Sequence, residues 1–230
     1  MTGIKIYAAC IKNNSISHLL GLYSGILNRD EKMKVNSFRF EADSLRSIGA
    51  ILLLKHSLMK NLNIGPLNVE LEKNANGKVY LKGRNDFYFN ISHSGDFVLL
   101  AFYDSEVGID IEKIEPVDLS MNGSYFSPEE CERFKSIPKN SQIDYFYELW
   151  TLKESYIKYL GTGLSLEPTK FVLDFNDDSI KVSCQMGFNT NCNFKRINDF
   201  KGYKAALCAC GNQNISYEIN YIDLEKLQFL

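Results

Sequence analysis

Val107-Gly108-Ile109-Asp110-Ile111-Glu112 alternates apolar residues with Gly, Asp and Glu, and this period of two is typical of a strand with one buried face. Asp110 and Glu112 therefore project to the same side of the strand. Same-face neighbours lie roughly 6.5–7 Å apart along a strand, a spacing that lets two carboxylates, or one and a water, hold a hard cation such as Mg²⁺. The stretch thus predicts a strand that carries two candidate metal ligands.

A second stretch supplies a third carboxylate: Trp150-Thr151-Leu152-Lys153-Glu154-Ser155-Tyr156-Ile157-Lys158. It reads as a helix ended by Gly161 and Gly163, because apolar residues recur at spacings of three, four and seven: Phe146, Leu149, Trp150, Ile157 and Leu160. Glu154 and Lys158 then lie one turn apart on a shared face. Each stretch alone could be ordinary, a solvated sheet face or a surface ion pair. Their combination favours a metal site with a phosphate clamp.

Composition bounds the class of protein. The 230 residues are 45% hydrophobic, enough to bury a core in one large domain or two small ones. The longest apolar run, residues 48–54, is far too short to cross a membrane. The polar N-terminus lacks the hydrophobic stretch of a signal peptide. We expect a cytoplasmic protein that does not bind a membrane.

Charge and cysteine usage narrow the options further. The net charge of −2 argues against a general nucleic-acid binder, because neutralising a phosphate backbone takes an excess of Lys and Arg. The six cysteines show no Cys-x-x-Cys spacing, which favours buried thiols over a disulfide framework or a zinc site. Any cationic site must therefore be local.

One local basic cluster lies in the first half. Lys32, Lys34, Arg39 and Arg46 come before and at the start of a predicted helix. The core stripe of this helix is formed by apolar residues at helical spacing: Leu45, Ile48, Ile51, Leu52, Leu58 and Leu62. On its own, the cluster would be read as a solvated helix face.

Turns and strands follow this helix. Residues 74–78 predict a turn that contains Gly77 and places Lys78 where the turn meets a short strand. Residues 87–102 predict two strands joined by a polar turn, Ser92-His93-Ser94-Gly95-Asp96. A histidine in a turn is usually a capping or hydrogen-bonding group, so ligand contact is the second explanation for His93.

The second half repeats the coarse order of the first. Ser127-Pro128-Glu129-Glu130 is a helix start, with Ser as cap, Pro at the first position and acids in the first turn. After the Trp150 helix, five strands are expected: residues 170–175, 180–184, 193–197, 204–210 and 216–222. Helix followed by antiparallel strands thus occurs twice. This order suggests two similar halves, residues 1–105 and 106–230, with a ligand cleft between them.

Three motifs resemble those of 4′-phosphopantetheinyl transferases of the surfactin-synthetase-activating (Sfp) type in order and spacing: Asn90-Ile91-Ser92-His93-Ser94, Gly108-Ile109-Asp110-Ile111-Glu112, and Trp150-x-x-Lys153-Glu154-Ser155-x-x-Lys158 with Gly161-x-Gly163-Leu164. The resemblance runs from about Lys32 to Ser165 and more loosely beyond. It implies transfer of the phosphopantetheine arm of coenzyme A to a serine of an apo acyl or peptidyl carrier protein, with release of adenosine 3′,5′-bisphosphate. The implied fold is an α+β pseudo-dimer, active as a monomer, in which each half packs a helix on a mainly antiparallel sheet and coenzyme A binds between the halves.

Carried over residue by residue, the resemblance makes Asp110, Glu112 and Glu154 the Mg²⁺ ligands, in agreement with the spacing argument. It places the nucleotide-side contacts of coenzyme A in the first half: Lys32, Lys34, Arg46, Gly77, Lys78, Ser92 and His93. Lys158 would reach the pyrophosphate. Catalysis would rest on Asp110, Glu154 and Lys158, because phosphoryl transfer depends mostly on positioning and charge neutralisation. Either Glu154 or a metal-bound water would take the serine proton.

The sequence departs from the family pattern at two places. Val79 stands where relatives often have Pro after Gly-Lys, a change in turn stiffness that removes no charged contact. Residues 119–126 occupy the place of a carrier-docking segment that is often basic in relatives, and here Gly123 and Ser124 leave it neutral. Steering of an acidic carrier would then be weaker. Docking would rely more on Met121 and Tyr125, whereas core packing is the expected role of Phe126.

Two other functions remain open at this level. One is a Mg²⁺-dependent pyrophosphatase that uses the same carboxylates on coenzyme A-like dinucleotides with water as the acceptor. The other is a non-catalytic module that binds coenzyme A or a carrier protein, although the complete set of Asp110, Glu112, Glu154 and Lys158 argues against it. The sequence leaves open whether the carrier serves fatty-acid, polyketide or nonribosomal-peptide assembly.

Overall fold

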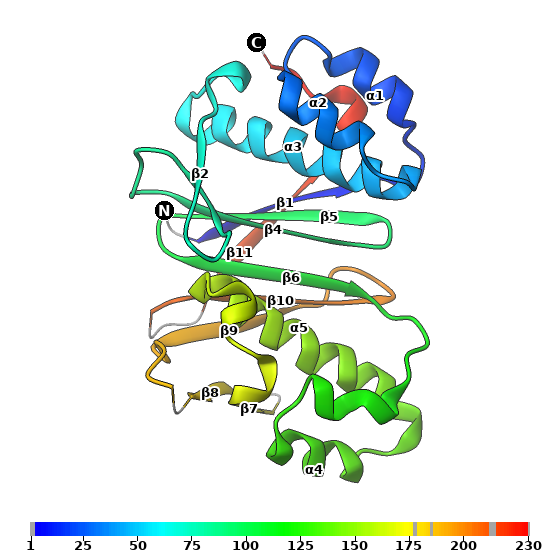
Figure 1. The fold of residues 1–230 in the computed structure, drawn as a ribbon, viewed down its shortest axis with the longest axis vertical. Helices are drawn as coiled ribbons and strands as arrows, with labels where there is room; N and C mark the ends of the chain where they lie inside the picture. Colours follow the sequence, from blue (N-terminus) through cyan, green and yellow to red (C-terminus); the bar gives the residue numbers. More distant parts are fainter. Residues whose placement is uncertain (1–2, 177–178, 185, 212–214, 230) are drawn as a thin grey trace.

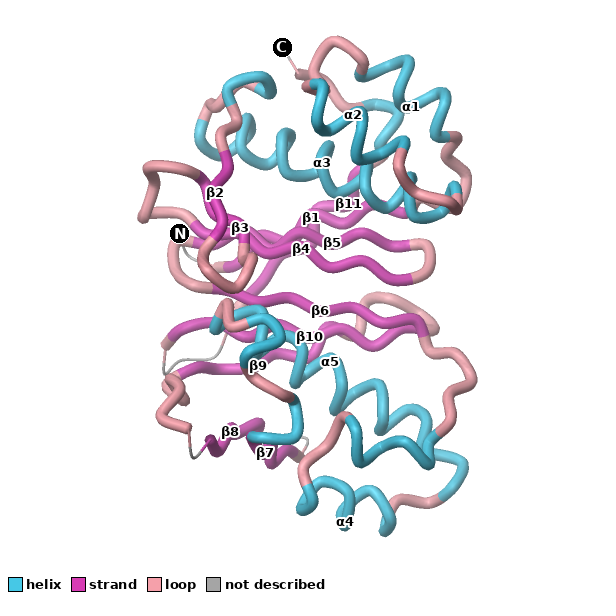
Figure 2. Tube along the Cα trace, in the orientation of Figure 1, coloured by secondary structure: helices cyan, strands magenta, loops and turns pink. Residues whose placement is uncertain are grey.

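The computed structural model describes residues 3–176, 179–184, 186–211 and 215–229. Its two larger β-sheets lie at the centre of the molecule, and the helices lie outside them (Figure 1, Figure 2). Apolar side chains of both sheets form the core between them, among them Ile6, Leu99, Ile109 and Leu207. Within the described residues, every helix is too short or too polar to cross a membrane. The chain is an α+β protein, as predicted.

The first half is built on a four-stranded sheet in the order β11-β1-β5-β4. Its strands are β1 (Ile4–Cys10), β4 (Tyr88–Ser94), β5 (Phe97–Tyr103) and β11 (Tyr217–Ile222), and a separate hairpin pairs β2 (Leu71–Lys73) with β3 (Val79–Leu81). Its helices are α1 (Ile16–Tyr23), α2 (Arg29–Asn36) and α3 (Glu41–Leu62). The long helix α3 packs on this sheet through a fully buried stripe that includes Ile48, Leu52 and Leu53.

The second half is built on a three-stranded sheet in the order β6-β10-β9. Its strands are β6 (Val107–Lys113), β9 (Cys192–Ile197) and β10 (Tyr203–Cys210), with a hairpin of β7 (Phe171–Phe175) and β8 (Ile180–Cys184), and its helices are α4 (Pro128–Ser136) and α5 (Gln142–Leu160). Short 3₁₀ turns complete the chain: η1 (Pro66–Asn68), η2 (Leu119–Ser124), η3 (Lys139–Ser141), η4 (Gly163–Ser165), η5 (Pro168–Lys170) and η6 (Leu224–Lys226). Leu149, Leu152 and Tyr156 of α5 are buried on this sheet.

The two halves repeat one plan. In the first, β5 lies between β1 and β4 and is antiparallel to both, and in the second β10 lies in the same way between β6 and β9. A long helix covers each sheet, α3 in the first half and α5 in the second, and each half adds one two-stranded hairpin. The predicted pseudo-dimer is therefore confirmed.

The repetition extends to an ion pair between a short helix and the long helix of each half. In each half a short helix begins with a capping box whose glutamate also turns towards a lysine of the long helix. Glu31 of α2 lies 3.0 Å from Lys55 Nζ, and Glu130 of α4 lies 2.6 Å from Lys153 Nζ. Both lysines also donate to a backbone carbonyl group beyond the long helix. Each pair ties a short helix to the helix that covers the sheet.

Most predicted elements of the second half are present with ends shifted by a residue or so. The helix ends as expected at Gly161, which takes the left-handed conformation (φ 65°) that glycine adopts without strain. The cap at Ser127 also holds, because its side chain accepts from the backbone N–H of Glu130. Phe126 is buried in the core, as expected.

One predicted turn is wrong. Ser92, His93 and Ser94 belong to strand β4, and the chain reverses at Gly95 and Asp96. These residues favour a turn in the sequence because a run of polar side chains is typical of a loop, and a strand with one polar face can have the same composition. In the structure the alternate polar side chains of β4 face a second strand, as described below.

Four helices or strands of the first half were not predicted: β1, α1, α2 and β2. Strand β11 was expected, but its partner was not, since it pairs in parallel with β1 at the edge of the first half's sheet. Strand β11, from the last part of the sequence, therefore lies beside β1, from the first part. The proposed division at residues 105 and 106 stays a prediction.

Candidate active site

The two halves meet where β4 runs beside β6. The side chains of Asn90, Ser92 and Ser94 in β4 accept hydrogen bonds from backbone N–H groups of alternate residues in β6. The distances from acceptor oxygen to backbone nitrogen are 2.9 Å for Ile109, 3.3 Å for Ile111 and 3.1 Å for Lys113. Side chains here supply acceptors that a neighbouring strand's carbonyl groups would supply in a continuous sheet. We call this contact the seam.

Asp110 lies at the centre of the seam and is only 2% exposed. Its Oδ1 accepts from Ser92 Oγ at 2.9 Å and from Lys158 Nζ at 2.6 Å. Lys158 also donates to Ser92 Oγ at 2.9 Å. Within the described part of the chain, Oδ2 is buried without a hydrogen-bond partner. Burial raises the pKa of Asp110, and the Lys158 ammonium opposes this shift.

Glu112 and Glu154 complete a group of acids around Asp110. Ser94 Oγ donates to Glu112 Oε2 at 2.8 Å. For both glutamates, burial is the first cause that raises the pKa and the charge of Asp110 is the second. Lys158 lowers the pKa of both in part. The three carboxylates thus share one electrostatic environment and repel one another when ionised.

Gly108 allows α5 to approach this strand. A Cβ atom at this position would clash with the backbone of Ser155 and Tyr159 in α5. The glycine therefore lets the helix lie directly on β6, and this close packing brings Glu154 and Lys158 to the seam. A glycine two residues before the acidic pair is a geometric requirement of the site.

The three carboxylates are candidate ligands for a divalent cation. All three donors are carboxylates, which Mg²⁺ prefers, and the free Oδ2 of Asp110 is a buried acceptor without a donor. Among the residues that the structure describes, however, no group of three or more acidic, His or Cys side chains is arranged to hold a metal. Lys158 supplies the positive charge beside Asp110 in this arrangement. The donors fit Mg²⁺ in type, and the metal site stays a prediction.

A cavity of about 570 Å³ opens between the halves beside these acids. Glu154 and Lys158 line it from α5, Phe89 and Ile91 from β4, and Gly77 from the turn before β3. Apolar residues from both halves form much of its wall, including Val79, Trp150, Ile157, Leu166 and Pro168. Its volume is within the range of small-molecule sites. The predicted cleft between the halves is therefore present, with Glu154 and Lys158 at its surface.

Arg46 of α3 and His93 of β4 lie beside the seam. Arg46 donates to Asp43 Oδ1 at 2.6 Å and to the carbonyl oxygen of Gly95 at 2.9 Å, so it links the start of α3 to the β4–β5 turn. His93 is exposed on β4, and its pKa is lowered by partial desolvation and then by the positive charges of Arg46 and Lys158. The histidine therefore lies within electrostatic reach of both cations. The positive charges of Arg46 and Lys158 favour an anion here.

Lys78 lies directly before β3, where the turn meets the strand as expected, and it also contacts the second half. Its buried ammonium lies 2.5 Å from Glu106 Oε2 and donates to the carbonyl oxygen of Tyr159 at 3.0 Å. Desolvation lowers the pKa of Lys78, and Glu106 opposes this shift. Lys78 thus joins the β3 hairpin to the second half while it lines the cavity. Gly77 beside it adopts a left-handed conformation, φ 88°.

Lys32 and Lys34 lie on α2. Lys32 lines a separate surface hollow together with Arg29, Met33, Asn36 and Ser37, and Lys34 is exposed. These two lysines lie apart on α2, whereas the residues gathered around the seam are Arg46, Ser92, His93, Asp110, Glu112, Glu154 and Lys158.

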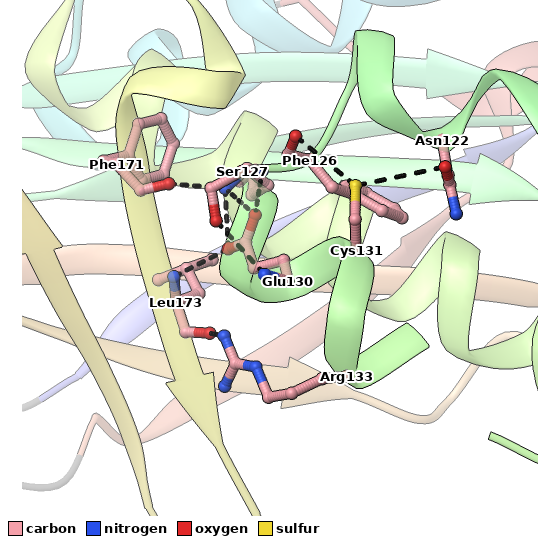
Figure 3. Close-up of polar contacts among 9 residues, drawn as sticks. Asn122, Phe126, Ser127, Glu130, Cys131, Arg133, Phe171 and Leu173 are labelled. Carbon is pink, nitrogen blue, oxygen red and sulfur yellow. Dashed lines mark hydrogen bonds and ion pairs between the residues drawn. The ribbon is translucent and has the colours of Figure 1, made fainter. Parts of the chain in front are cut away.

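Glu130 of α4 holds the helix that carries Glu154, α5, through an ion pair with Lys153. Glu130 accepts from the backbone N–H groups of Ser127 and Leu173, and Figure 3 shows it between these two residues. Lys153 Nζ completes the network at 2.7 Å and 2.6 Å from its two oxygens. Both members of this pair are fully buried. Burial lowers the pKa of Lys153 to about 8, although Glu130 opposes the shift.

Asn90, Ser94 and Glu106 were missed as site residues. The signal for the first two was present, because Asn90, Ser92 and Ser94 recur with the same period of two as Asp110 and Glu112. Two strands with matching polar faces can pair through those faces. Glu106 carried no pattern, since its role depends on a lysine far away in the sequence.

Comparison with known proteins shows the family to which the chain belongs. A family model described as the 4′-phosphopantetheinyl transferase superfamily matches residues 106–208, and one described as 4′-phosphopantetheinyl transferase, N-terminal, matches residues 14–105. The chain therefore belongs to the 4′-phosphopantetheinyl transferase superfamily, and the predicted enzyme class is confirmed.

Individual relatives cover nearly the whole chain. It is 30% identical over 206 residues to 4′-phosphopantetheinyl transferase Sfp of Bacillus subtilis (strain 168). This matched region covers 89% of this chain and 91% of that protein. It is 30% identical over 217 residues to 4′-phosphopantetheinyl transferase gsp of Aneurinibacillus migulanus, with 94% and 90% covered. A solved structure, Thermotoga maritima holo-[acyl-carrier-protein] synthase (AcpS), has 20% identity and a TM-score of 0.41 over 47% of this chain and 64% of that chain.

Proposed function

We propose that the seam is the catalytic centre of an enzyme that transfers the 4′-phosphopantetheine group of coenzyme A to a serine of an apo acyl or peptidyl carrier protein. Adenosine 3′,5′-bisphosphate is the second product. The observation that carries the proposal is that Asp110, Glu112, Glu154 and Lys158 lie together at the contact between the halves, where Glu154 and Lys158 line the cleft. Membership of the superfamily supports the reaction class.

Cationic side chains hold the pyrophosphate of coenzyme A in this proposal. Lys158 lies 2.6 Å from Asp110 Oδ1, so a phosphate oxygen that enters beside Asp110 meets a donor already in place. Arg46 extends the positive surface towards the nucleotide, and the imidazole of His93 adds a hydrogen-bonding group beside it. Asp110, Glu112 and Glu154 would hold Mg²⁺, which when bound supplies further positive charge to the pyrophosphate oxygens. Lys32 and Lys34 would assist at the 3′-phosphate.

Glu154 takes the proton of the carrier serine. Its carboxylate lines the cavity, and burial together with Asp110 raises its pKa, which makes it a stronger base than an exposed glutamate. The serine oxygen attacks the phosphorus that bears the pantetheine arm, and the bond from that phosphorus to the adenosine phosphate breaks. The serine proton goes to Glu154, and the electron pair leaves with adenosine 3′,5′-bisphosphate. The apolar cavity wall suits the pantetheine arm.

The same proposal covers the setting of the reaction. Both walls of the cleft come from one chain, which supports a monomeric enzyme. The net charge of −2 supports a protein partner over nucleic acid. We assign the enzyme to the cytoplasm, with the nucleotide-side contacts in residues 1–105 and the acids and catalytic helix in residues 106–230.

The test is a reaction with coenzyme A, Mg²⁺ and a panel of apo carrier proteins from fatty-acid, polyketide and nonribosomal-peptide assembly. Intact mass should show one phosphopantetheine group on the serine of at least one carrier, with an equal amount of adenosine 3′,5′-bisphosphate. A carrier whose serine is replaced by Ala is the matched control. Free 4′-phosphopantetheine without carrier modification would favour the hydrolytic alternative and contradict the proposal.

A further inference from the structure

Three cysteine thiols gather on the α5 face of the second half's sheet. Cys192 begins β9, Cys210 ends β10, and the register places them directly opposite each other. Cys208 shares the face of Cys210, because alternate residues of a strand point the same way. Cys192 and Cys208 pack in the core beneath α5 beside Tyr156 and Tyr159. The thiols therefore form one group, on strands that the catalytic proposal does not use.

Cys192 and Cys210 form a non-hydrogen-bonded pair of the antiparallel ladder. The backbone N–H of Cys210 donates to the carbonyl oxygen of Glu106, just before β6, at 3.3 Å. In a strand the N–H and C=O of one residue point to the same neighbouring strand, so the backbone of Cys210 points to β6 and away from Cys192. Opposed residues of this kind have Cα atoms about 4.5 Å apart and the closer side chains. A disulfide spans Cα distances of roughly 4.4–6.8 Å.

The three thiols differ in their exposure to solvent, and this difference gives Cys210 and Cys192 different roles. Cys210 is exposed, Cys192 is half-buried and Cys208 is fully buried. Burial raises the pKa of Cys208, and its neighbour Cys192 adds to the shift, so Cys208 stays a protonated thiol. A reagent in solution therefore meets Cys210 first, and Cys192 is the thiol placed to resolve the product.

We propose that Cys192 and Cys210 are a dithiol that a small-molecule disulfide oxidises to a reversible cross-strand disulfide. The Cys210 thiolate attacks the reagent, a mixed disulfide forms, and one reagent thiol leaves. The Cys192 thiolate then attacks the Cys210 sulfur, and the second reagent thiol leaves. Two protein thiols are oxidised, one disulfide molecule is reduced to two thiols, and the two protons released by the cysteines pass to the reagent thiolates.

This inference does not depend on the proposed function. The disulfide would join β9 to β10 beneath the helix that carries Glu154, and the closed loop restricts the unfolded chain. Disulfides of cytosolic proteins, where they occur, are usually transient and catalytic or redox-sensing. The oxidised protein should therefore unfold at a higher temperature than the reduced protein.

The experiment treats the reduced full-length protein with oxidised glutathione. Two of its six thiols should become unreactive, intact mass should fall by the two hydrogens lost, and peptide mapping should find Cys192 linked to Cys210. Dithiothreitol should restore both thiols. The Cys192→Ser variant should instead keep one glutathione on Cys210, because the resolving thiol is gone.

Two serine variants serve as the matched pair. Cys10 and Cys210 are each the exposed last residue of a strand, but Cys10 faces Phe97 instead of a thiol. Cys10→Ser should therefore oxidise like the parent, and Cys210→Ser should not form the bridge. A parent protein that retains glutathione on Cys210, or that links Cys208 to either thiol, would overturn the proposal. So would oxidation that leaves all thiols reactive.

Discussion

Glu154 illustrates how the site works against the stability of the fold. Burial and the charge of Asp110 raise the pKa of Glu154, so the folded protein favours its neutral form. A carboxyl group with a raised pKa in the folded state leaves stability intact below its unfolded pKa, and that stability is lost as pH rises through the folded pKa. Ionised Glu154 therefore destabilises the fold at neutral pH.

This predicts that Glu154→Gln raises the thermal midpoint at pH 7 in the presence of a chelator. The difference from the parent should disappear below about pH 4, where the carboxyl groups are protonated in both states. Calorimetry or circular dichroism across a pH series measures it. Glu72→Gln, on the exposed strand β2, is the control and should show no such pH-dependent gain. A parent more stable than Glu154→Gln at pH 7 would contradict the electrostatic description.

Arg46 is the residue for which we predict a role in binding the 3′-phosphate of coenzyme A. Arg46→Ala should raise the KM for coenzyme A by about tenfold, as expected for the loss of a charge-assisted contact, and leave the KM for dephospho-coenzyme A nearly unchanged. Arg46→Lys should recover only part of the loss, because it loses the planar pair of donors. Steady-state kinetics with both substrates checks this. Equal effects on the two substrates would show that Arg46 does not bind the 3′-phosphate.

Single residues were predictable where local spacing decides their position. The two-residue period placed Asp110 and Glu112 on one face, and the helical period placed Glu154 and Lys158 one turn apart. The partners of Lys78 were not predictable, because Glu106 and Tyr159 come close only after the halves assemble. The local sequence around a lysine does not distinguish a buried ion pair from a phosphate-binding site.

At the scale of elements, the structure offers an internal comparison of two ion pairs, Glu130–Lys153, which is fully buried, and Glu31–Lys55, in which the glutamate is partly exposed. Loss of one partner leaves a buried charge uncompensated and costs about 3–5 kcal/mol. Lys153→Met should therefore lower the free energy of unfolding more than Lys55→Met does, because Glu130 is fully buried whereas the side chain of Glu31 is 20% exposed. Only Lys153→Met should also lower kcat, since Lys153 lies in the helix that carries Glu154 and Lys158. Lys55→Met should instead raise the KM for coenzyme A, because its partner Glu31 lies on α2.

Urea denaturation and kinetics at a temperature well below both midpoints separate these effects. The double variant Lys153→Met with Glu130→Gln should regain part of the lost stability, since no buried charge remains unpaired. If Lys55→Met lowered kcat as much as Lys153→Met, the loss would reflect general destabilisation and not the position of α5.

Long, strongly patterned elements were predictable, and short polar ones were not. The 19 residues of α5 and the seven of β6 carry clear periods. The eight residues of α2 do not, although Asn28 and Glu31 match the capping-box spacing that marks a helix start. Strand β4 was given a false end at Ser92, because its polar face meets β6 in place of solvent. Pairing between distant segments, such as β11 with β1, leaves no local signal.

At the scale of the whole molecule, the open question is how the carrier protein docks. The segment η2 is neutral at Gly123 and Ser124, and Met121 within it is 53% exposed. Gly123 faces open space and accepts a side chain without a clash. Gly123→Lys with Ser124→Arg should therefore raise the apparent on-rate for an acidic carrier and steepen its dependence on salt. Coenzyme A affinity should not change.

A salt series of transfer rates at limiting carrier concentration measures this change. Gly123→Ser with Ser124→Thr is the uncharged control and should behave as the parent. Identical salt profiles for the parent and the basic variant would show that η2 does not meet the carrier.

The central claim is that the seam between the halves, with Asp110 at its centre, is the transferase centre. Asp110→Asn tests it most directly, because the amide retains the size of the side chain and an oxygen for Ser92 and Lys158 but removes the charge. With coenzyme A, Mg²⁺ and an accepted apo carrier, intact mass should show transfer at least about a hundredfold slower than by the parent, while circular dichroism shows the same fold. Transfer by Asp110→Asn at near the parent's rate would contradict the account.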